Sequence, residues 1–499
     1  MTDPLPDPFA ATSAAWPAGV TPPRTLVINP PRVDGCTVVR EERFEHRDIG
    51  SCYPPLSHLQ VAAALEAAGV PVTLVDAMGP DLSWEETAAR IDAARPEVVF
   101  ARVAFDCQGP DSRVFAHARS RHGALTVARC KIVAEADAVL DQYLREHPYV
   151  DLFVLAEPDA VVVDVVRARA EGRPWSDVPG IAYREGGAIR RTAIPEPPAD
   201  LDTFPRPAWH LLPTLEPYHT GVLPPPFAIV QTTRGCPFQC RFCAYRRNRI
   251  RYHSAERVLD ELRWLKASRG LRSFLLFDDV VGLQKGRFEA LLRGLIEARL
   301  GLKWACCTRA DLLTEEQARL MKRAGCVEVA IGVESGAPAV LELAQKGVSL
   351  PDIERAARIV KSHRMLFYAM CILGLPGETR ETVRETYRFI RRIDPFYTQF
   401  CFSTPLPNTP NYAWYKERGF LLTEDWSKYS SLYPDPVVRT EGMTAADLAE
   451  MRAWIYRKLL FRPWYLLKKI RPFDWRWNVE GARKIWQRMR AVHSGRAVR

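Results

Sequence analysis

The sequence has no apolar run long enough to cross a membrane. Runs such as 274–277 and 327–333 are far shorter than the roughly 20 residues that span a bilayer. The first 24 residues contain neither a basic stretch nor an apolar core, so we expect no signal peptide. These two absences predict a cytoplasmic protein.

Cysteine is scarce as well. Twelve cysteines in 499 residues are too few for a disulfide scaffold, and a reducing compartment argues the same way. Nine of them are scattered, and we interpret these as small buried hydrophobic residues. The other three, Cys236, Cys240 and Cys243, lie within eight residues of one another. This cluster therefore needs a chemical explanation.

Excess charge is absent from most of the chain. The formal net charge is +10, but residues 451–499 contain 14 Lys and Arg residues against Asp474 and Glu480. The remaining residues are therefore close to neutral, which argues against a broad nucleic-acid-binding surface. We expect no nucleic-acid partner.

The basic tail also contains many aromatic residues. One interpretation is a final amphipathic helix that packs on the preceding domain. The alternative is peripheral contact with the inner membrane surface, because interleaved cations and aromatic rings suit anionic headgroups and the interface. The residues concerned would be Arg457, Lys458, Arg462, Lys468, Lys469 and Arg471, with Trp464, Tyr465 and Trp475.

The first half of the chain alternates between apolar strand patterns and helical patterns. After a flexible leader at 1–23, a domain at 24–193 is expected to form a parallel, doubly wound Rossmann-like α/β sheet, with a ligand at the carboxyl ends of its strands. The predicted strands are 25–28, 70–75, 98–103, 125–128 and 152–155, and the predicted helices are 56–68, 84–94 and 133–144.

A proline-rich linker at 194–226 leads to a second α/β region at 227–425. Its six strand–helix units suggest a partial or full β/α barrel, whose sites also gather at the carboxyl strand ends. The predicted strands are 228–232, 273–277, 303–307, 327–333, 366–373 and 397–403, and predicted helices include 255–267, 315–324 and 381–393. Residues 426–499 are expected to form a helical, basic and aromatic C-terminal region.

The cysteine cluster follows the first barrel strand in the segment RGCPFQCRFCAY, residues 234–245. Three thiolates in a C-x3-C-x2-C spacing can bind three corners of an iron–sulfur cubane and leave the fourth iron open. Zinc is the alternative, but a structural zinc site needs four ligands, and no fourth Cys or His lies at finger spacing. Inert thiols are the remaining possibility. The spacing favours the iron–sulfur cluster.

The triplet resembles the signature of the radical S-adenosylmethionine (SAM) enzymes, and further motifs of that family follow in order. They are FLLFDD at 274–279, TRAD at 308–311, AIGVESG at 330–336, Lys346-Gly347, ILGLPGET at 372–379, and TPLPNTPNY at 404–412, where Asn408 replaces the usual glycine. The resemblance implies a 4Fe-4S cluster on Cys236, Cys240 and Cys243, and cleavage of SAM to methionine and a 5′-deoxyadenosyl radical.

The resemblance also implies a set of SAM-binding residues. Phe242 would pack on the adenine, and Asp279 or Asp278 would accept a hydrogen bond from the methionine ammonium. Arg309 is a plausible partner of the carboxylate and Glu334 of the ribose or methionine. The fourth- and fifth-strand motifs add Ser335 and Gly374. The alternative roles are structural, with Asp278 or Asp279 as a helix N-cap and Glu334 bonded to an amide at the barrel end.

The N-terminal domain resembles the cobalamin-binding domain that precedes many radical enzymes. Tyr53, Pro54, Pro55 and Leu56 open the matching segment, and Glu157 occupies the position of the glutamate after the fifth strand. The resemblance therefore implies a bound cobalamin without a lower histidine ligand, since no D-x-H-x-x-G motif is present. The usual Gly-Gly after the fourth strand is replaced by residues 128–131, Ala-Arg-Cys-Lys. A vestigial domain without cobalamin is the alternative.

The wider match is to the family of the anaerobic magnesium-protoporphyrin ester cyclase and the hopanoid-associated radical proteins. It implies radical modification of an unactivated carbon in a small molecule, either lipid- or tetrapyrrole-like or a natural product. Cobalamin-dependent methyl transfer is the leading expectation, and radical cyclisation, oxidation or rearrangement without methyl transfer is the alternative. A non-catalytic binding module is the remote alternative. A flavodoxin- or ferredoxin-type electron donor is the expected partner.

Overall fold

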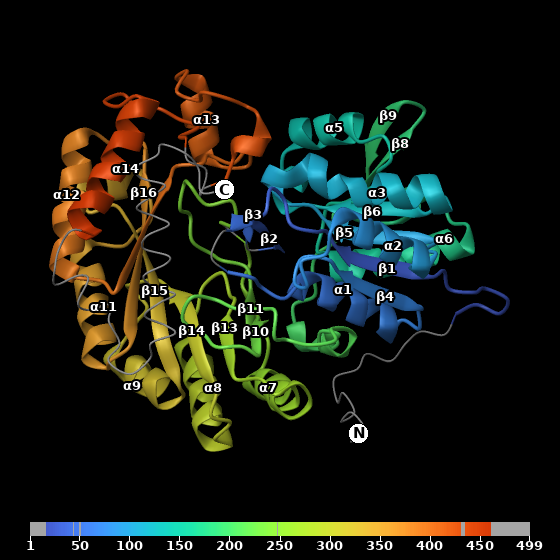
Figure 1. The fold of residues 1–499 in the computed structure, drawn as a ribbon, viewed down its shortest axis with the longest axis horizontal. Coiled ribbons are helices and arrows are strands. Elements are labelled where there is room, and N and C mark those ends of the chain that lie inside the picture. Colours follow the sequence, from blue (N-terminus) through green and yellow to red (C-terminus); the bar gives the residue numbers. More distant parts are fainter. Residues whose placement is uncertain (1–15, 43, 49–50, 247, 431–434, 461–499) are drawn as a thin grey trace. The chain divides into compact units, whose positions relative to one another are not determined.

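The computed structural model describes residues 16–42, 44–48, 51–246, 248–430 and 435–460 (Figure 1). The chain forms two compact units. The first comprises residues 1–236, 248–279 and 284–304, and the second comprises residues 237–247, 280–283 and 305–499. The predicted leader, several short segments and the tail beyond residue 460 lie partly or wholly outside the described residues. The predicted domain boundaries stay predictions.

The first unit contains a seven-stranded sheet with the order β4-β1-β5-β6-β7-β8-β9. Five strands are parallel, namely β1 (Thr25–Asn29), β4 (Val72–Asp76), β5 (Val98–Arg102), β6 (Leu125–Arg129) and β7 (Leu152–Val154). They confirm the predicted doubly wound sheet. The antiparallel strands β8 (Ile181–Glu185) and β9 (Ala188–Arg191) were not predicted. Gly186 and Gly187 join them with positive φ angles, which a two-residue hairpin turn requires.

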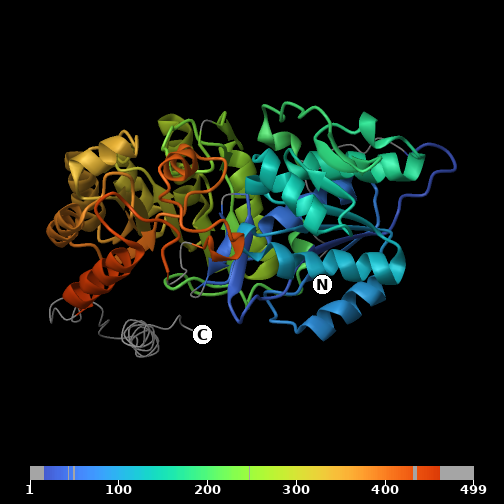
Figure 2. The same cartoon turned by 90° about the horizontal axis from the view of Figure 1, so that it is seen from above.

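Helices cover both faces of this sheet. Helices α1 (Leu56–Ala67) and α6 (Pro158–Glu171) pack against each other, and α2 (Trp84–Ala94) lies beside α3 (Gln108–His122) (Figure 2). The apolar core between the sheet and the first pair includes Val27, Phe100 and Val127, all fully buried. The helix predicted at 133–144 is split into α4 (Lys131–Ala134) and α5 (Asp137–Glu146), because Ala136 is extended.

A second hairpin, also not predicted, connects β1 to α1. It pairs β2 (Thr37–Glu41) with β3 (Phe44–Asp48) and is called the charged hairpin below. Its sequence is rich in Arg and Glu and lacks the apolar alternation of an ordinary strand. These charged side chains form buried ion pairs that take the place of apolar contacts.

The cluster loop, residues 235–250, connects β11 (Thr233–Arg234) with β12 (Arg251–Tyr252), which pair in antiparallel fashion. In the first unit, β10 (Phe227–Val230) is parallel to β13 (Ser273–Leu276), and α7 (Ala255–Arg269) packs on α8 (Lys285–Ala298). The sheet that contains these strands has six strands in the order β10-β13-β14-β15-β16-β17, with β14 at Lys303–Thr308. This order agrees with the predicted partial barrel.

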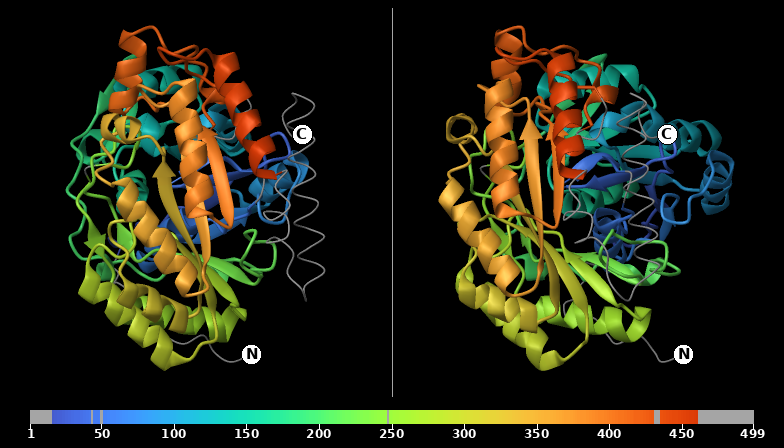
Figure 3. Two further views of the ribbon diagram at one scale, coloured as in Figure 1. Left: turned by 90° about the vertical axis from the view of Figure 1, so that its left-hand side faces the viewer. Right: turned by 60° about the vertical axis from the view of Figure 1, so that its left-hand side comes forward.

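The second unit contains the parallel strands β15 (Cys326–Glu334), β16 (Leu366–Leu373) and β17 (Tyr397–Phe402). Helices α9 (Glu315–Arg323), α11 (Leu350–Ser362) and α12 (Arg380–Ile393) run along their outer face (Figure 3). Shorter helices α10 (Pro338–Leu343) and α13 (Pro410–Glu417) follow strand ends.

The last described helix, α14 (Ala445–Leu460), packs on the second unit. The Trp454 ring lies 5.0 Å from that of Tyr387, and the Phe400 amide donates a hydrogen bond to the Tyr456 hydroxyl at 3.1 Å. This part of the tail therefore packs as the first of the two interpretations expects, while Arg457 and Lys458 are exposed. Within the described ranges, no helix has the length and apolarity of a membrane span.

Candidate iron–sulfur and SAM site

The base of the cluster loop is held in the first unit by backbone geometry. Gly235 has a φ of +95°, and a Cβ there would lie 2.3 Å from the Arg249 carbonyl oxygen, so only glycine fits. The Gly235 amide donates to Asp279 Oδ2 at 2.9 Å, and the Asn248 amide donates to the Cys236 carbonyl at 2.9 Å. These contacts set the position of the Cys236 backbone as the chain leaves β11.

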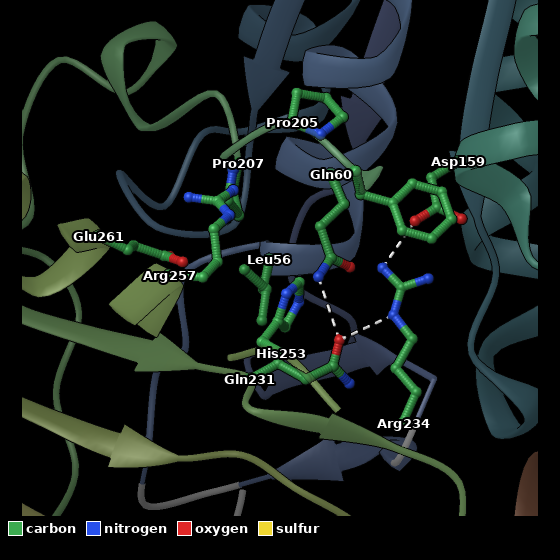
Figure 4. Close-up of a pocket in the computed structure, with 11 residues that line it drawn as sticks. Leu56, Gln60, Asp159, Pro205, Pro207, Gln231, Arg234, His253, Arg257 and Glu261 are labelled. Atoms are coloured by element: carbon green, nitrogen blue, oxygen red, sulfur yellow. Dashed lines mark hydrogen bonds and ion pairs between the residues drawn. The ribbon is translucent and has the colours of Figure 1, made fainter. Parts of the chain in front are cut away.

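Arg234, directly before this glycine, is largely buried, and its guanidinium lies beside Asp159 at the start of α6 (Figure 4). Its guanidinium donates to Asp159 at 2.6 Å, to Glu157 at 2.7 Å and to Gln231 at 3.1 Å. Arg251, its partner across β11 and β12, also donates to Glu157. Burial alone would raise the pKa of Glu157, but the two guanidinium groups hold that pKa below its ordinary value. Glu157, predicted as a cobalamin contact, therefore binds the base of the cluster loop.

The two aspartates after β13 differ in accessibility. Asp278 is 1% exposed and accepts hydrogen bonds from the Thr232 amide and hydroxyl, both at 2.6 Å, and from the Thr233 amide at 2.9 Å. Its carboxylate is thus engaged in holding the turn after β10. Asp279 is half-buried, with Oδ2 on the Gly235 amide. The geometry favours Asp279 over Asp278 as a contact to a ligand.

The predicted Tyr53–Leu56 contacts lie at the start of α1. The Tyr53 ring lies 6.2 Å from Phe227 and 5.9 Å from Phe277, so it packs on residues at β10 and directly after β13. Pro54, Pro55 and Leu56 are buried, with Pro55 at the helix N-cap. A packing role accounts for all four residues.

The other two cluster cysteines belong to the second unit, where the loop is held through its backbone. The Arg241 amide donates to the Ala344 carbonyl at 3.0 Å, and the Asn411 amide donates to the Arg241 carbonyl at 3.2 Å. The Tyr245 amide donates to Cys243 Sγ at 3.4 Å, a contact that favours a thiolate. Asn408, the departure from the usual glycine, donates to the Ala244 carbonyl at 3.2 Å.

Phe242 lies between the second and third cysteines, as expected of the adenine-packing position. Its half-buried ring packs on the apolar cluster of Ala337, Val340, Ala344 and Leu375, at and around α10. This packing gives the ring a defined position, so stacking on an adenine would need no further ordering of the side chain.

Two cations lie near Cys240. Burial raises the pKa of the Cys240 thiol, and the charges of Lys346 and Arg309 oppose that rise. Arg309 donates to both carboxylate oxygens of Asp311 at 3.1 and 3.0 Å and lies 3.6 Å above the Phe238 ring. Arg309 is therefore already paired, and a carboxylate of SAM would have to share it with Asp311.

Glu334 pairs with Lys346 at the end of β15. Lys346 is 6% exposed in its side chain and donates to Glu334 and, at 2.6 Å, to the Gly332 carbonyl. A Cβ at Gly332 would lie 2.3 Å from the Glu334 carboxylate, so glycine leaves room for the pair. Glu334 itself has a φ of +58°, where the register of β15 and β16 shifts. Such strain in a non-glycine residue is typical of functional sites.

Ser335 and Gly374 have structural contacts. The Ser335 hydroxyl is fully buried, lies 3.1 Å from the Thr386 hydroxyl and accepts from the Ala337 amide at 3.2 Å. Gly374 has a φ of +87°, which favours glycine; its amide donates to Glu378 and its carbonyl accepts from Tyr415. The contacts of Ser335 and Gly374 hold the backbone directly after β15 and β16.

Sequence reasoning missed three charged residues of this region. Arg234, Lys346 and Glu378 all lie within the family motifs, but the sequence by itself gives them no role. Only the fold shows that each is buried or largely buried beside a partner. A charged residue next to a glycine, as at 234–235, 346–347 and 377–378, is the signal that could have found them, since a buried charge needs a partner.

Glu378 leads to a prediction on pH dependence. It is fully buried, its Oε1 has no hydrogen-bond partner among the described residues, and burial raises its pKa to about 8 from an ordinary 4.5. The folded protein therefore holds a proton that the unfolded chain releases above about pH 4.5. Its contribution to stability falls as pH rises through this interval and levels off above pH 8.

Glu378→Gln has no such proton to lose. Urea unfolding of the variant should show a stability that rises relative to wild type, by on the order of a few kcal/mol, between about pH 5 and 8. Glu417→Gln, at an exposed position of α13, should instead follow the wild-type profile. Parallel profiles for Glu378→Gln and wild type would contradict the assignment.

The donor set fits an iron–sulfur cluster. The triplet offers thiols, one close to two cations and one accepting an amide N–H, and both features favour thiolates. Among the described residues, no three Cys, His, Asp or Glu side chains converge on one point where a single metal ion could bind. A cubane places no such demand, since each thiolate binds its own iron.

Comparison with known proteins identifies the class. The profile of the Radical SAM superfamily matches residues 230–390, from β10 to α12. An uncharacterized methyltransferase of Pyrococcus horikoshii is 30% identical over 442 residues, which cover 85% of this chain and 91% of that protein. The chain belongs to the radical SAM superfamily. This confirms the predicted enzyme class, with its 4Fe-4S cluster and SAM.

Two further comparisons describe the surroundings of this radical SAM domain. The anaerobic magnesium-protoporphyrin IX monomethyl ester cyclase of Rubrivivax gelatinosus is 28% identical over 84% of this chain and 76% of its own length. The solved radical SAM methyltransferase TsrM of Kitasatospora setae, with cobalamin and a [4Fe-4S] cluster bound, superimposes with a TM-score of 0.63 at 20% identity, covering 79% of this chain and 74% of TsrM. The likeness to TsrM confirms the predicted α/β fold class.

Proposed function

We propose that this radical SAM enzyme modifies an unactivated carbon of a small, hydrophobic molecule. The proposal rests on the intact cysteine triplet and on the cations and amide donors around Cys240 and Cys243. When bound, the cluster and SAM supply one-electron cleavage of a carbon–sulfur bond and abstraction of a hydrogen atom from the substrate. An electron donor of the flavodoxin or ferredoxin type supplies the electron.

The protein's own residues bind and orient these groups. Cys236, Cys240 and Cys243 hold three irons. Asp279 accepts from the ammonium of SAM, since Asp278 is fully engaged, and Phe242 presents its ring to the adenine. Arg309 and the Glu334–Lys346 pair set the charge around Cys240.

Two reactions are candidates. Methyl transfer is supported by the names of two similar proteins. One is the uncharacterized methyltransferase of Pyrococcus horikoshii, and the other, at lower identity, is the methyltransferase TsrM. Cyclisation, oxidation or rearrangement without methyl transfer is supported by the cyclase relative and by the charged hairpin, which occupies the strand edge where a methyl-carrying cobalamin would be expected.

Product analysis tests both candidates. Anaerobically reconstituted protein, given SAM and a reductant with extracts of a deletion strain, should release 5′-deoxyadenosine. Accumulation of S-adenosylhomocysteine in step with it would identify methyl transfer, and its absence would identify the second reaction. Release of neither product would contradict the proposed function. The extract that stimulates turnover, lipid or pigment, identifies the substrate class.

We also propose peripheral membrane contact through the C-terminal tail. Arg457 and Lys458 are exposed on α14, and the other basic and aromatic residues of this proposal lie outside the described residues. Truncation after Leu460 should leave the packed helix intact and abolish salt-sensitive co-sedimentation with anionic liposomes, because each cation contributes on the order of 1 kcal/mol at such a surface. Equal sedimentation of full-length and truncated protein would contradict this contact.

A further inference from the structure

The carboxyl edge of the seven-stranded sheet is closed by the charged hairpin. In a doubly wound sheet, a ligand binds in the crevice outside these strand ends. Here the ends of β1, β5 and β6 are all bridged to β2, β3 and the turn between them. The residues at this edge are therefore bound to one another rather than left for a ligand.

Arg40 of β2 closes the end of β1. Its guanidinium donates to Asn29 at 3.1 Å, to the Pro30 carbonyl at 2.8 Å and to the Pro31 carbonyl at 2.9 Å. It also makes a two-point ion pair with Asp111 of α3 at 2.9 and 2.7 Å. Arg40 and Asp111 are 2% and 0% exposed, so each charge is stabilised by the other and by the hydrogen bonds of the pair rather than by water.

Two arginines at the ends of β5 and β6 bind the same hairpin. Arg102 is fully buried and donates to Glu42 and Glu45, each at 2.5 Å. Arg129 donates to Glu42 at 3.1 and 3.2 Å and to the Val154 carbonyl at 3.1 Å, which reaches β7. The ends of β5 and β6 thus share one hydrogen-bonded network through Glu42, and Arg40 ties the end of β1 to the same hairpin.

Glu45 also occupies the turn after β6. It accepts from the Lys131 amide at 2.9 Å and lies 3.1 Å from the Cys130 thiol. A glycine pair within the segment 128–131 would let a ligand approach the backbone. In this protein, the side chains of that segment and the Glu45 carboxylate fill the space. The nucleotide tail of a cobalamin does not fit this edge as it stands.

Separation of such a network is costly. Removing one member of a buried ion pair is strongly destabilising, because the other charge stays buried without a partner. Insertion of a nucleotide tail would separate several pairs at once.

We propose that the charged hairpin permanently replaces the nucleotide at this sheet edge, so that the protein binds no cobalamin through a tail buried in the sheet. Radical chemistry without methylcobalamin follows as the preferred reaction.

Cobalamin binding tests the inference on the full-length protein. Anaerobically reconstituted enzyme is incubated with excess hydroxocobalamin, desalted, and assayed for iron and for corrin absorption. We expect a full cluster without stoichiometric corrin. One equivalent of retained corrin would overturn the inference. Release of 5′-deoxyadenosine without added cobalamin is measured in parallel, so that a failure here is distinct from a failure of the proposed radical function.

Amide hydrogen exchange tests whether the hairpin is a fixed part of the fold. The amides paired between β2 and β3 should exchange at least about 100-fold more slowly than in an unfolded chain, with or without hydroxocobalamin. Glu45→Gln should speed their exchange, while Glu85→Gln, at an exposed position of α2, should not. Loss of hairpin protection on adding hydroxocobalamin would show a movable gate and overturn the inference.

Discussion

Replacement of Cys236, Cys240 or Cys243 by alanine is expected to abolish both the iron–sulfur cluster and the cleavage of SAM. Each thiolate binds its own iron, so the loss of one leaves the cluster with an exposed, labile corner. The loop is held by backbone contacts on both sides of the triplet, including the Gly235 and Arg241 amides. The variants should therefore fold with an intact loop and fail only in binding iron.

Controls for this prediction come from the same protein. Cys306→Ala and Cys307→Ala change cysteines of β14 that lie outside the triplet, and these variants should keep nearly all of the iron. Iron content, the cubane absorption band and 5′-deoxyadenosine release are measured under anaerobic conditions. Full iron content in any triplet variant would contradict the ligand assignment, as would a zinc-loaded wild-type protein without a cubane spectrum.

Lys346→Met is expected to give a large loss of stability. Lys346 and Glu334 are 6% and 8% exposed, and the lysine is the ion-pair partner of a glutamate already held at positive φ. Methionine would leave that carboxylate buried without its partner, at a cost of about 3–5 kcal/mol. The cation that opposes the rise in the Cys240 pKa would also be lost, so the variant should bind its cluster more weakly.

A double variant separates these two effects. Lys346→Met combined with Glu334→Gln contains no unpaired buried charge and should regain much of the lost stability, while the weaker cluster binding should remain. Lys303→Met, at an exposed position of β14, should change stability by no more than about 0.5 kcal/mol. Urea unfolding and iron retention during dialysis are the measurements. Additive losses in the double variant would contradict the coupling.

Sequence patterns alone are sufficient for the order of most elements and for the class of chemistry. The strand predicted at 366–373 and the helix at 84–94 match the structure residue for residue, because apolar periodicity and the Ser83 capping box are local signals. The cysteine spacing is local as well, and by itself it indicates the iron–sulfur site of a radical SAM enzyme. Chemistry of this kind is contained in a few consecutive residues.

Tertiary structure decided which of the candidate residues are available to a ligand. Asp278 and Asp279 are adjacent in sequence, yet the first is engaged by the turn after β10 and the second is half-buried. Glu157 occupies the position of a cofactor contact, yet it is bound by two arginines 77 and 94 residues away. The charged hairpin was missed because glutamates and arginines in sequence are typical of exposed segments. Charges are buried only when distant partners meet them, and pairings over such separations are formed by the fold rather than by neighbouring sequence.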